Sequence, residues 1–357
     1  MTIFYVTLIL VYIFSLLARG LSNKDTGRAS IMFTIIVAII LTVVSGLRNN
    51  IGDTSMYVHT YNLIGPDYIS KGEYEAGFIL ILKCLKSISE NPQFMIMIIS
   101  IIVNFLVIFT LWRYSQYYYF EIATFLYVAS GYYLVTMNGI RQCLAASIIF
   151  AATPFLIKRK AVIYLIIVIL AITIHSSAFI MIPIYFIVNV KPWSKQSLLL
   201  VICTIAAMLL YEPLMNLAVI IVGSKMEAYK ISTEGGTSII RVAVFFVPVF
   251  LSYLRRDKIS DKWDKINIFN NINLLSFLIM LFSLIQWVFA RFTLYLQPYT
   301  FILMGYIVKN CFYGKEKRLL YYGLVICYMT FFFIECPSNL NGIPYKTDFN
   351  VMEFLYQ

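Results

Sequence analysis

The chain consists of long apolar runs separated by short polar segments. A run of about 20 mostly apolar residues can cross the hydrocarbon core of a bilayer as a helix. Runs of about this length occupy residues 2–18, 30–47, 93–112, 119–137, 139–157, 197–222, 238–254, 267–289, 291–308 and 319–335. The pattern therefore predicts an all-α, polytopic integral membrane protein.

One further apolar stretch, residues 161–190, is interrupted near its middle by His175-Ser176-Ser177. Lysines and arginines flank this stretch at both ends. Because such basic clusters mark the cytoplasmic side, the stretch has to cross the membrane an even number of times. We expect two short helices, 161–174 and 178–190, folded back as a hairpin at His175. The total is then about twelve crossings, with both termini outside.

The runs follow one another so closely that we expect one transmembrane domain over residues 1–357. Residues 48–92 form an external loop that contributes to a functional site at the outer face. Its sequence YEAGFILILKCLKSI is typical of an amphipathic segment that lies on the membrane surface or dips into it.

Composition and charge support a membrane protein. The chain is 61% hydrophobic and 13% charged, whereas soluble domains carry about 25% charged residues. A net charge of +11 would suggest nucleic acid in a soluble protein, but here eighteen of the 28 basic residues lie in loops predicted to be cytoplasmic. No nucleic-acid partner is expected.

Three arginines oppose this charge bias, because Arg48, Arg141 and Arg291 fall at predicted outer ends of spans. Each alone could be a side chain that reaches the lipid head groups. An arginine is also a permanently charged fork that can bind phosphate through two hydrogen bonds. Three such forks near one membrane depth suit a pyrophosphate or another polyanion.

Other polar residues fall at the same predicted face: Asp53, Tyr57 and Glu75 in the external loop, Asn138 and Gln142 beside Arg141, and His175 at the hairpin tip. Asp53 could equally be a turn residue or a helix cap. A lone histidine in an apolar stretch could be a core residue with satisfied hydrogen bonds. The sequence has no Walker loop, GxGxxG, GxSxG or DxD motif and no metal-binding spacing of histidines. We therefore expect chemistry without a nucleotide, a metal or another cofactor.

The segments that carry these residues resemble the motifs of a known family. In order, GLRNNIGDTSMYVHTYN, YEAGF, MNGIRQCLAASI, IHSSAFIMIPIY and FARFTLYLQPY are similar to motifs of the EpsG family. These bacterial polytopic proteins are assigned to exopolysaccharide and O-antigen (Wzy-like) polymerisation. The similarity runs from near residue 30 to the end of the chain, with Ile51 in place of a valine before Gly52.

The resemblance implies a GT-C-like polymerase in the bacterial plasma (inner) membrane, with its active site facing the periplasm or the outside. Its substrates would be oligosaccharide repeat units on undecaprenyl pyrophosphate. The growing glycan would move from its lipid pyrophosphate to the terminal sugar hydroxyl of a new lipid-linked unit. The product would be O-antigen, capsule or exopolysaccharide. Membrane lipids and a chain-length regulator are the other partners that the resemblance implies.

The candidate residues can be given roles in this reaction. Arg141 and Arg291, with Arg48 as third choice, would bind the pyrophosphate, whose charge grows as it leaves. His175 or Asp53 would accept the proton of the attacking hydroxyl, and His175 is slightly favoured because its side chain titrates near neutral pH. Four residues would bind sugar hydroxyls or support the arginines: Asn138, Gln142, Tyr57 and Glu75.

Two other functions fit parts of the pattern. A transporter or flippase for a lipid-linked sugar would need polar residues along the whole depth of the membrane and two gates. The charges within the predicted spans lie mainly near the outer face, with Arg241, Glu212 and Glu121 as exceptions. A glycan ligase would use nearly the same chemistry as a polymerase. The family resemblance favours the polymerase.

Overall fold

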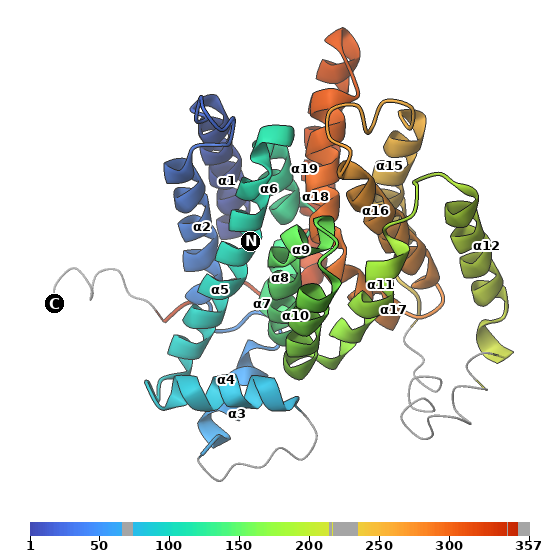
Figure 1. Cartoon of the computed structure of the whole chain (residues 1–357). Helices are drawn as coiled ribbons and strands as arrows, with labels where there is room; N and C mark the ends of the chain where they lie inside the picture. The colour runs from blue at the N-terminus through green and yellow to red at the C-terminus, as the bar shows by residue number, and fades with distance from the viewer. Residues whose placement is uncertain (66–73, 214–215, 217–234, 341, 349–357) are drawn as a thin grey trace. The chain divides into compact units, whose positions relative to one another are not determined.

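The computed structural model describes residues 1–65, 74–213, 216, 235–340 and 342–348 (Figure 1). Within these ranges every regular element is a helix, which confirms the all-α prediction. The chain forms two compact units. Met1–Ile182 and Phe301–Gln357 make the first, and Pro183–Thr300 make the second.

The first unit holds most of the helices: α1 (Thr2–Gly20), α2 (Ile31–Gly46), α3 (Thr54–Leu63), α4 (Ala76–Lys86), α5 (Pro92–Arg113), η1 (Ser115–Tyr117), α6 (Phe120–Ala129), α7 (Tyr132–Asn138), α8 (Ile140–Ala151), α9 (Thr153–Ile157), α10 (Ala161–Ile174), η2 (Ser176–Ile180) and α19 (Gly314–Asn339). The second unit holds α12 (Lys195–Leu209), α15 (Ile239–Leu254), α16 (Ile266–Phe282), α17 (Val288–Phe292) and η3 (Thr293–Tyr295). Two helices, α11 (Met181–Ile187) and α18 (Gln297–Asn310), run across the boundaries between the units.

Three described helices are long and apolar enough to cross a membrane by themselves: α1, α5 and the part of α19 over Gly314–Pro337. The pair α6 and α7 passes the same test together, with a bend of 50° between them. Shorter apolar helices lie within most of the other predicted runs, namely α2, α8, α10, η2 with α11, α12, α15 and α16. A polytopic membrane protein is therefore supported, and the number of crossings stays a prediction.

Two predicted spans are interrupted where the sequence contains proline. The run 139–157 is divided between α8 and α9, and Pro154 lies in the first turn of α9. The run 291–308 is divided among the end of α17, η3 and α18, and the first turn of α18 holds Pro298. Proline lacks the N–H that would continue the preceding helix but fits a first turn. The end of the run 197–222 lies outside the described residues, apart from Asn216.

The predicted break at His175 is present in the structure. Helix α10 ends at Ile174, and the backbone of His175 is extended, with φ −151° and ψ 116°. The short helix η2 starts at Ser176. The chain thus changes direction at the polar residues that interrupt the apolar stretch, while the complete hairpin to residue 190 stays a prediction.

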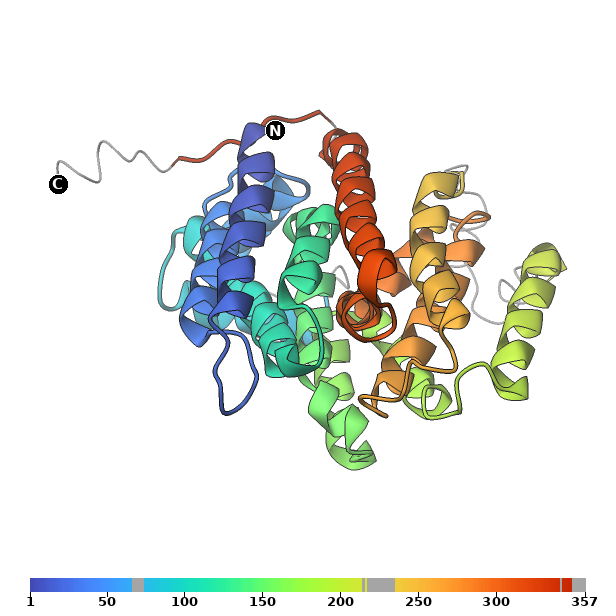
Figure 2. The same ribbon diagram turned by 90° about the horizontal axis from the view of Figure 1, so that it is seen from above.

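In the first unit, α1 packs against α2 and α6, and α5 packs against α2 and α8 (Figure 2). Helices α3 and α4 run across one end of these helices (Figure 1). Helix α4 is the predicted amphipathic segment, and its apolar face is buried through Phe78, Ile79, Leu82 and Leu85. It packs on α5 and α10. Helices α3 and α4 therefore form a folded cap on this end of the unit.

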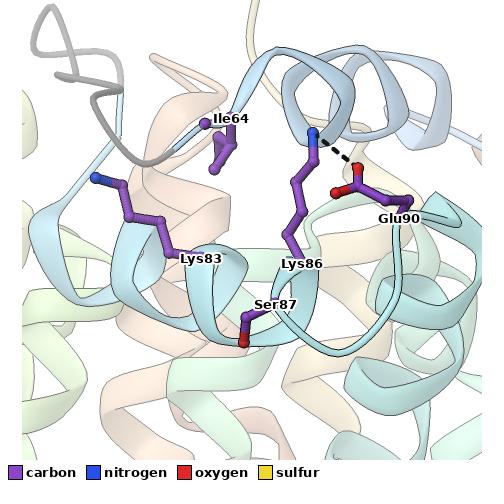
Figure 3. A pocket seen from close by; sticks show the side chains of 6 residues that line it. Ile64, Lys83, Lys86, Ser87 and Glu90 are labelled. Carbon is purple, nitrogen blue, oxygen red and sulfur yellow. Dashed lines mark ion pairs between the residues drawn. The ribbon is translucent and has the colours of Figure 1, made fainter.

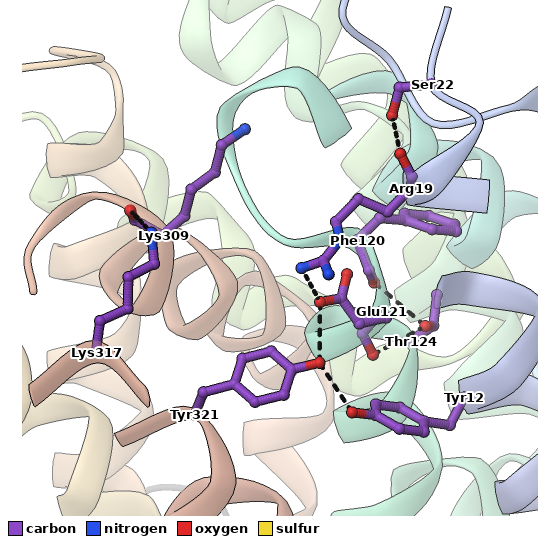
Figure 4. A network of polar contacts seen from close by, with 9 residues as sticks. All are labelled: Tyr12, Arg19, Ser22, Phe120, Glu121, Thr124, Lys309, Lys317 and Tyr321. Atoms are coloured by element: carbon purple, nitrogen blue, oxygen red, sulfur yellow. Dashed lines mark hydrogen bonds and ion pairs between the residues drawn. The ribbon is translucent and has the colours of Figure 1, made fainter. Parts of the chain in front are cut away.

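A cluster of polar side chains joins α1, α6 and α19 (Figure 4). Glu121, in the first turn of α6, is fully buried and forms an ion pair with Arg19. The Tyr321 hydroxyl lies 3.1 Å from the Glu121 carboxylate and 2.8 Å from the Tyr12 hydroxyl. A buried carboxylate has to be paired, and these contacts join α6 to α1 and α19. The end of α1 and the starts of α6 and α19, where these residues lie, are predicted to be on the cytoplasmic side.

The second unit has its own small core. Val249 of α15 packs with Leu274 and Leu278 of α16. The buried Asn271 side chain donates hydrogen bonds to the Val188 and Val190 carbonyls, at 2.9 and 2.7 Å. These two bonds satisfy carbonyls that follow the end of α11, as the burial of backbone polar groups requires.

Candidate functional site

The loop after α2 brings Asp53 to the end of α7. Gly52 has a φ of +56°, and the Asp53 N–H donates to the Asn138 side-chain oxygen at 3.0 Å. A Cβ on Gly52 would lie 2.5 Å from that oxygen and 2.7 Å from the Asn138 Cα. Only glycine fits this close approach and this left-handed backbone. Asp53 directly precedes α3, but its side chain makes no capping hydrogen bond, and the residue is exposed.

Glu75 connects α8 to Ser176, the first residue of η2. One carboxylate oxygen accepts from Nη1 of Arg141 at 2.6 Å, and the other accepts from the Ser176 backbone N–H at 2.7 Å. Helix α4 approaches α10 closely because its second residue is Gly77. A Cβ there would lie 2.7 Å from the Thr173 carbonyl oxygen. Three segments that are distant in the sequence therefore meet at Glu75.

The surroundings of this ion pair favour charge on both partners. Burial raises the pKa of the Glu75 carboxyl, but the Ser176 hydrogen bonds and the Arg141 charge outweigh burial, so the pKa lies below its usual value. The Arg141 guanidinium lies 4.5 Å from the Tyr74 ring centroid, within range of a cation–π interaction. Its buried Nε–H has no acceptor among the described residues. A buried donor of this kind calls for a partner, which a ligand oxygen would supply.

Tyr57 lies against the same group of residues. Its ring centroid is 6.5 Å from that of Tyr74 and 6.0 Å from that of Phe78. Burial raises the pKa of the Tyr57 hydroxyl, although hydrogen bonding and the charge of Arg141 oppose the rise. The phenol therefore stays protonated at neutral pH and can donate a hydrogen bond.

His175 belongs to a second set of contacts beside the first. Its Nδ1 lies 2.7 Å from the Ser177 hydroxyl and 3.3 Å from the Ser177 backbone nitrogen. The buried Gln142 side chain donates to the same hydroxyl at 3.2 Å. Because Gln142 follows Arg141 directly, the histidine set and the ion pair share the start of α8.

Arg48 is placed differently from Arg141. It is only 2% exposed, and it donates to the Ser45 carbonyl, to the Thr54 hydroxyl at 3.2 Å and to the Ser100 hydroxyl at 3.3 Å. Burial lowers its pKa to about 10, so it remains charged at neutral pH. These contacts tie α2, α3 and α5 together, and Arg48 thus supports the loop that carries Asp53.

Arg291 lies on α17 in the second unit. Its guanidinium lies 4.7 Å from the Trp287 ring centroid, and the residue is exposed. The placement of Arg291 in one site with Arg141 stays a prediction.

Two pockets lie close to the loop and α4. The first, of about 470 Å³, is bounded by α3 and α4 and is lined by Lys83, Lys86 and Glu90 among others (Figure 3). Lys86 donates to the Tyr61 and Asn62 carbonyls and pairs with Glu90 at 3.5 Å, so its charge is partly used within the protein. The second pocket, of about 420 Å³, is lined mainly by amides and charged groups: Asn49, Asn50, Val58, Asn91, Pro92, Gln93, Lys346 and Asp348.

Part of this site could not be identified from sequence. Lys346 lies beside the loop. Its carbonyl accepts from the Asn49 N–H at 3.1 Å, and its N–H donates to the Asn50 side-chain oxygen at 2.9 Å. The position of the Tyr74 ring, 4.5 Å from the Arg141 guanidinium, likewise depends on the fold and not on a local sequence pattern. For Ser176 and Ser177 the signal was present, because the polar interruption of the apolar stretch includes both hydroxyls. Among the described residues, no three His, Cys, Asp or Glu side chains gather as a metal site would require.

Among the comparisons with known proteins, one family model matches most of the chain. No curated protein and no solved structure matches this sequence. The model of the EpsG family matches residues 31–347, a range that includes every candidate residue discussed above. The chain therefore belongs to the EpsG family.

Proposed function

We propose that this protein is a membrane glycosyltransferase that polymerises lipid-linked oligosaccharide repeat units. Membership of the EpsG family supports a Wzy-like polysaccharide polymerase role in general. The observation that carries the finer proposal is the meeting of Arg141, Glu75 and the His175–Ser177 turn at one end of the first unit. A cation, a carboxylate and an imidazole from three distant segments are the groups that a transfer from a lipid pyrophosphate needs.

The proposed reaction joins two lipid-linked glycans. The terminal hydroxyl oxygen of a new unit bonds to the anomeric carbon of the growing glycan. The bond between that carbon and the pyrophosphate oxygen breaks, and its electron pair leaves with undecaprenyl pyrophosphate. The hydroxyl proton passes to a base on the protein. No sugar nucleotide, metal or other cofactor takes part in this scheme.

Arg141 is the principal ligand of the pyrophosphate in this proposal. Its Nη1 is used by Glu75, and its Nε–H lacks an acceptor among the described residues. Fixed donors aimed at a leaving group stabilise the charge that develops there. Arg291 would add a second cation from the other unit. Arg48, buried under the loop, would contribute its charge at longer range.

The base in this scheme is His175 or Asp53. His175 lies in the turn that Glu75 binds, and Asp53 is exposed and does not cap its helix. The supporting residues have separate tasks. Asn138 holds the Asp53 backbone, Gln142 contacts Ser177, and Tyr57 and Glu75 surround Arg141. Their remaining polar atoms would bind sugar hydroxyls.

The proposal also includes the setting of the enzyme. It would cross the bacterial plasma membrane about twelve times in a GT-C-like architecture, with the site toward the periplasm or the outside. Residues 1–357 would act as one transmembrane domain, with the loop 48–92 as a wall of the site. A chain-length regulator would set the length of the product.

Reconstitution tests this function directly. The purified protein in vesicles is given a synthetic undecaprenyl-pyrophosphate repeat unit, with EDTA and without sugar nucleotides. We expect a ladder of products that differ by one repeat unit, with release of undecaprenyl pyrophosphate. A single transfer to a foreign acceptor would indicate the ligase, and movement of the lipid-linked sugar across the bilayer without bond formation would indicate the flippase. Either result, or growth only with added nucleotide, contradicts the proposal.

A further inference from the structure

Two groups of Ser177 lie within hydrogen-bond distance of one ring nitrogen of His175. The Ser177 backbone N–H points at Nδ1 from 3.3 Å, and the Ser177 hydroxyl lies 2.7 Å from the same atom. A backbone N–H can only donate, so Nδ1 has to accept. A neutral imidazole carries one proton, and this proton is then on Nε2.

Gln142 strengthens this arrangement through the serine. Its side-chain amide donates to the Ser177 oxygen at 3.2 Å, and Gln142 is only 4% exposed. Because Nδ1 already accepts from the backbone N–H, the hydroxyl can bond to it only as a donor, and Gln142 donates to a lone pair of the same oxygen. Hydrogen bonds that follow one another in this way reinforce each other in a poorly solvated site. The direction of donation runs from Gln142 through Ser177 to His175.

We infer that Gln142 and Ser177 hold His175 in the tautomer with the proton on Nε2, so that the ring acts as a hydrogen-bond donor and not as the base. Gln142 and Ser177 are positioning residues in this assignment. Two hydrogen bonds at Nδ1 favour this tautomer by more than about tenfold. His175 would have to lose both bonds, or rotate its ring, before Nδ1 could take a proton from a substrate.

The consequence for the reaction rests on the proposed function. The Nε2–H donates to an oxygen of the departing pyrophosphate, where negative charge develops, and no proton moves from the ring. The proton of the attacking hydroxyl goes to the Asp53 carboxylate instead. Glu75 is less suited to this task, because its two oxygens already accept from Arg141 and Ser176.

The tautomer can be measured without any activity. The chain has two histidines, and His59 is exposed on α3, so His59→Gln leaves His175 as the single histidine. The protein is labelled with ¹⁵N-histidine, placed in bilayers and studied by solid-state NMR at about pH 8, above the ordinary histidine pKa of about 6.5. We expect an unprotonated Nδ1 and a protonated Nε2, with the other tautomer at less than about one tenth.

Variants of the turn test the relay. Ser177→Ala removes the hydroxyl, and Gln142→Leu removes the donor behind it, so each should raise the share of the second tautomer several-fold. Ser176→Ala is the matched control, because Ser176 bonds to Glu75 and not to the ring. A protonated Nδ1 in the unmodified turn overturns the inference. So does an unchanged tautomer ratio in both relay variants, or an equal shift in the Ser176 control.

Polymerisation supplies a second, separate test. Glutamine can donate from its amide but cannot accept a proton, so His175→Gln should stay within about tenfold of the parent. His175→Ala should lose more, and Asp53→Asn should lose 10²–10⁴-fold as a missing base does. An inactive His175→Gln beside an active Asp53→Asn makes His175 the base and refutes the inference. If no variant or parent polymerises, the proposed function fails while the NMR result still decides the tautomer.

Discussion

Arg141 has to serve two anions if it binds the pyrophosphate, because Glu75 already takes one of its nitrogens. A guanidinium can do this with its separate N–H groups, whereas a lysine ammonium is a single point charge. We expect Arg141→Lys to lose about 10–100-fold of polymer formation, the range of one or two charged hydrogen bonds, while it inserts normally. Arg113→Lys, at an exposed position at the end of α5, is the control and should be unaffected. Normal product ladders from Arg141→Lys would show that Arg141 does not bind the pyrophosphate.

Glu75 gives a prediction about pH. Its folded-state pKa lies below its usual value, so its stabilising effect is fully present above the unfolded pKa of about 4.3 and is lost as the pH falls through the folded pKa. Glu75→Gln should therefore lower the unfolding temperature at neutral pH, by the equivalent of about 1 kcal/mol for this partly exposed pair. The difference from the parent should disappear in acid. Glu90→Gln should show no such difference, because its side chain is 83% exposed. A pH-independent difference for Glu75→Gln would contradict this account.

At the scale of elements, the contact between α4 and α10 decides whether Glu75 reaches Ser176. Gly77→Ala would place a methyl group 2.7 Å from the Thr173 carbonyl oxygen and 2.8 Å from its Cβ, and backbone cannot yield as a side-chain tip can. We expect α4 to move away, with a cost of about 1–3 kcal/mol and loss of most polymerisation. Gly323→Ala in α19 is the matched control, since nothing lies within 4 Å of its added Cβ. Equal activity of the two variants would show that the close approach is unimportant.

The same elements show what the sequence could and could not predict. The break at His175 was predictable because polar residues interrupt an apolar run, which is a local signal. The bond from Ser176 to Glu75 was not, because it depends on how closely α4 packs on α10. Arg48 shows a different limit. An arginine at a helix end has the same local pattern whether it reaches the head groups or is buried against Ser45, Thr54 and Ser100.

At the scale of the whole molecule, replacement of Arg291 tests whether both units contribute residues to one pyrophosphate site. Arg291→Lys should reduce polymerisation as strongly as Arg141→Lys if both arginines bind the same pyrophosphate. Arg256→Lys is a close control within the same unit. Its guanidinium lies 4.6 Å from the Tyr253 ring centroid, much as that of Arg291 lies 4.7 Å from Trp287. Arg256 is predicted to be cytoplasmic, so its replacement should leave product ladders unchanged. Equal and mild effects of Arg291→Lys and Arg256→Lys would confine the pyrophosphate site to the first unit.

The orientation of the chain underlies all of these assignments, and it can be measured in intact cells. A cysteine-free background is needed first, because Cys84, Cys203 and Cys327 are exposed. Single cysteines at Ser55 and Lys315 are then compared, since both positions are exposed in the first unit and are predicted on opposite sides.

An impermeant thiol reagent should label Ser55→Cys in intact cells, and it should label Lys315→Cys and Ser260→Cys only after the cells are opened. Ser232 and Asn341 are also predicted on the outer side of the membrane, although the structure does not describe them. Cysteines at these two positions extend the test to the rest of the chain. The expectation rests on eighteen of 28 basic residues falling in loops assigned to the cytoplasm. Labelling at Ser260 or Lys315 from outside would reverse the assignment. The Glu121 cluster would then face the external medium, and Arg141 and His175 could not meet a substrate in the outer leaflet.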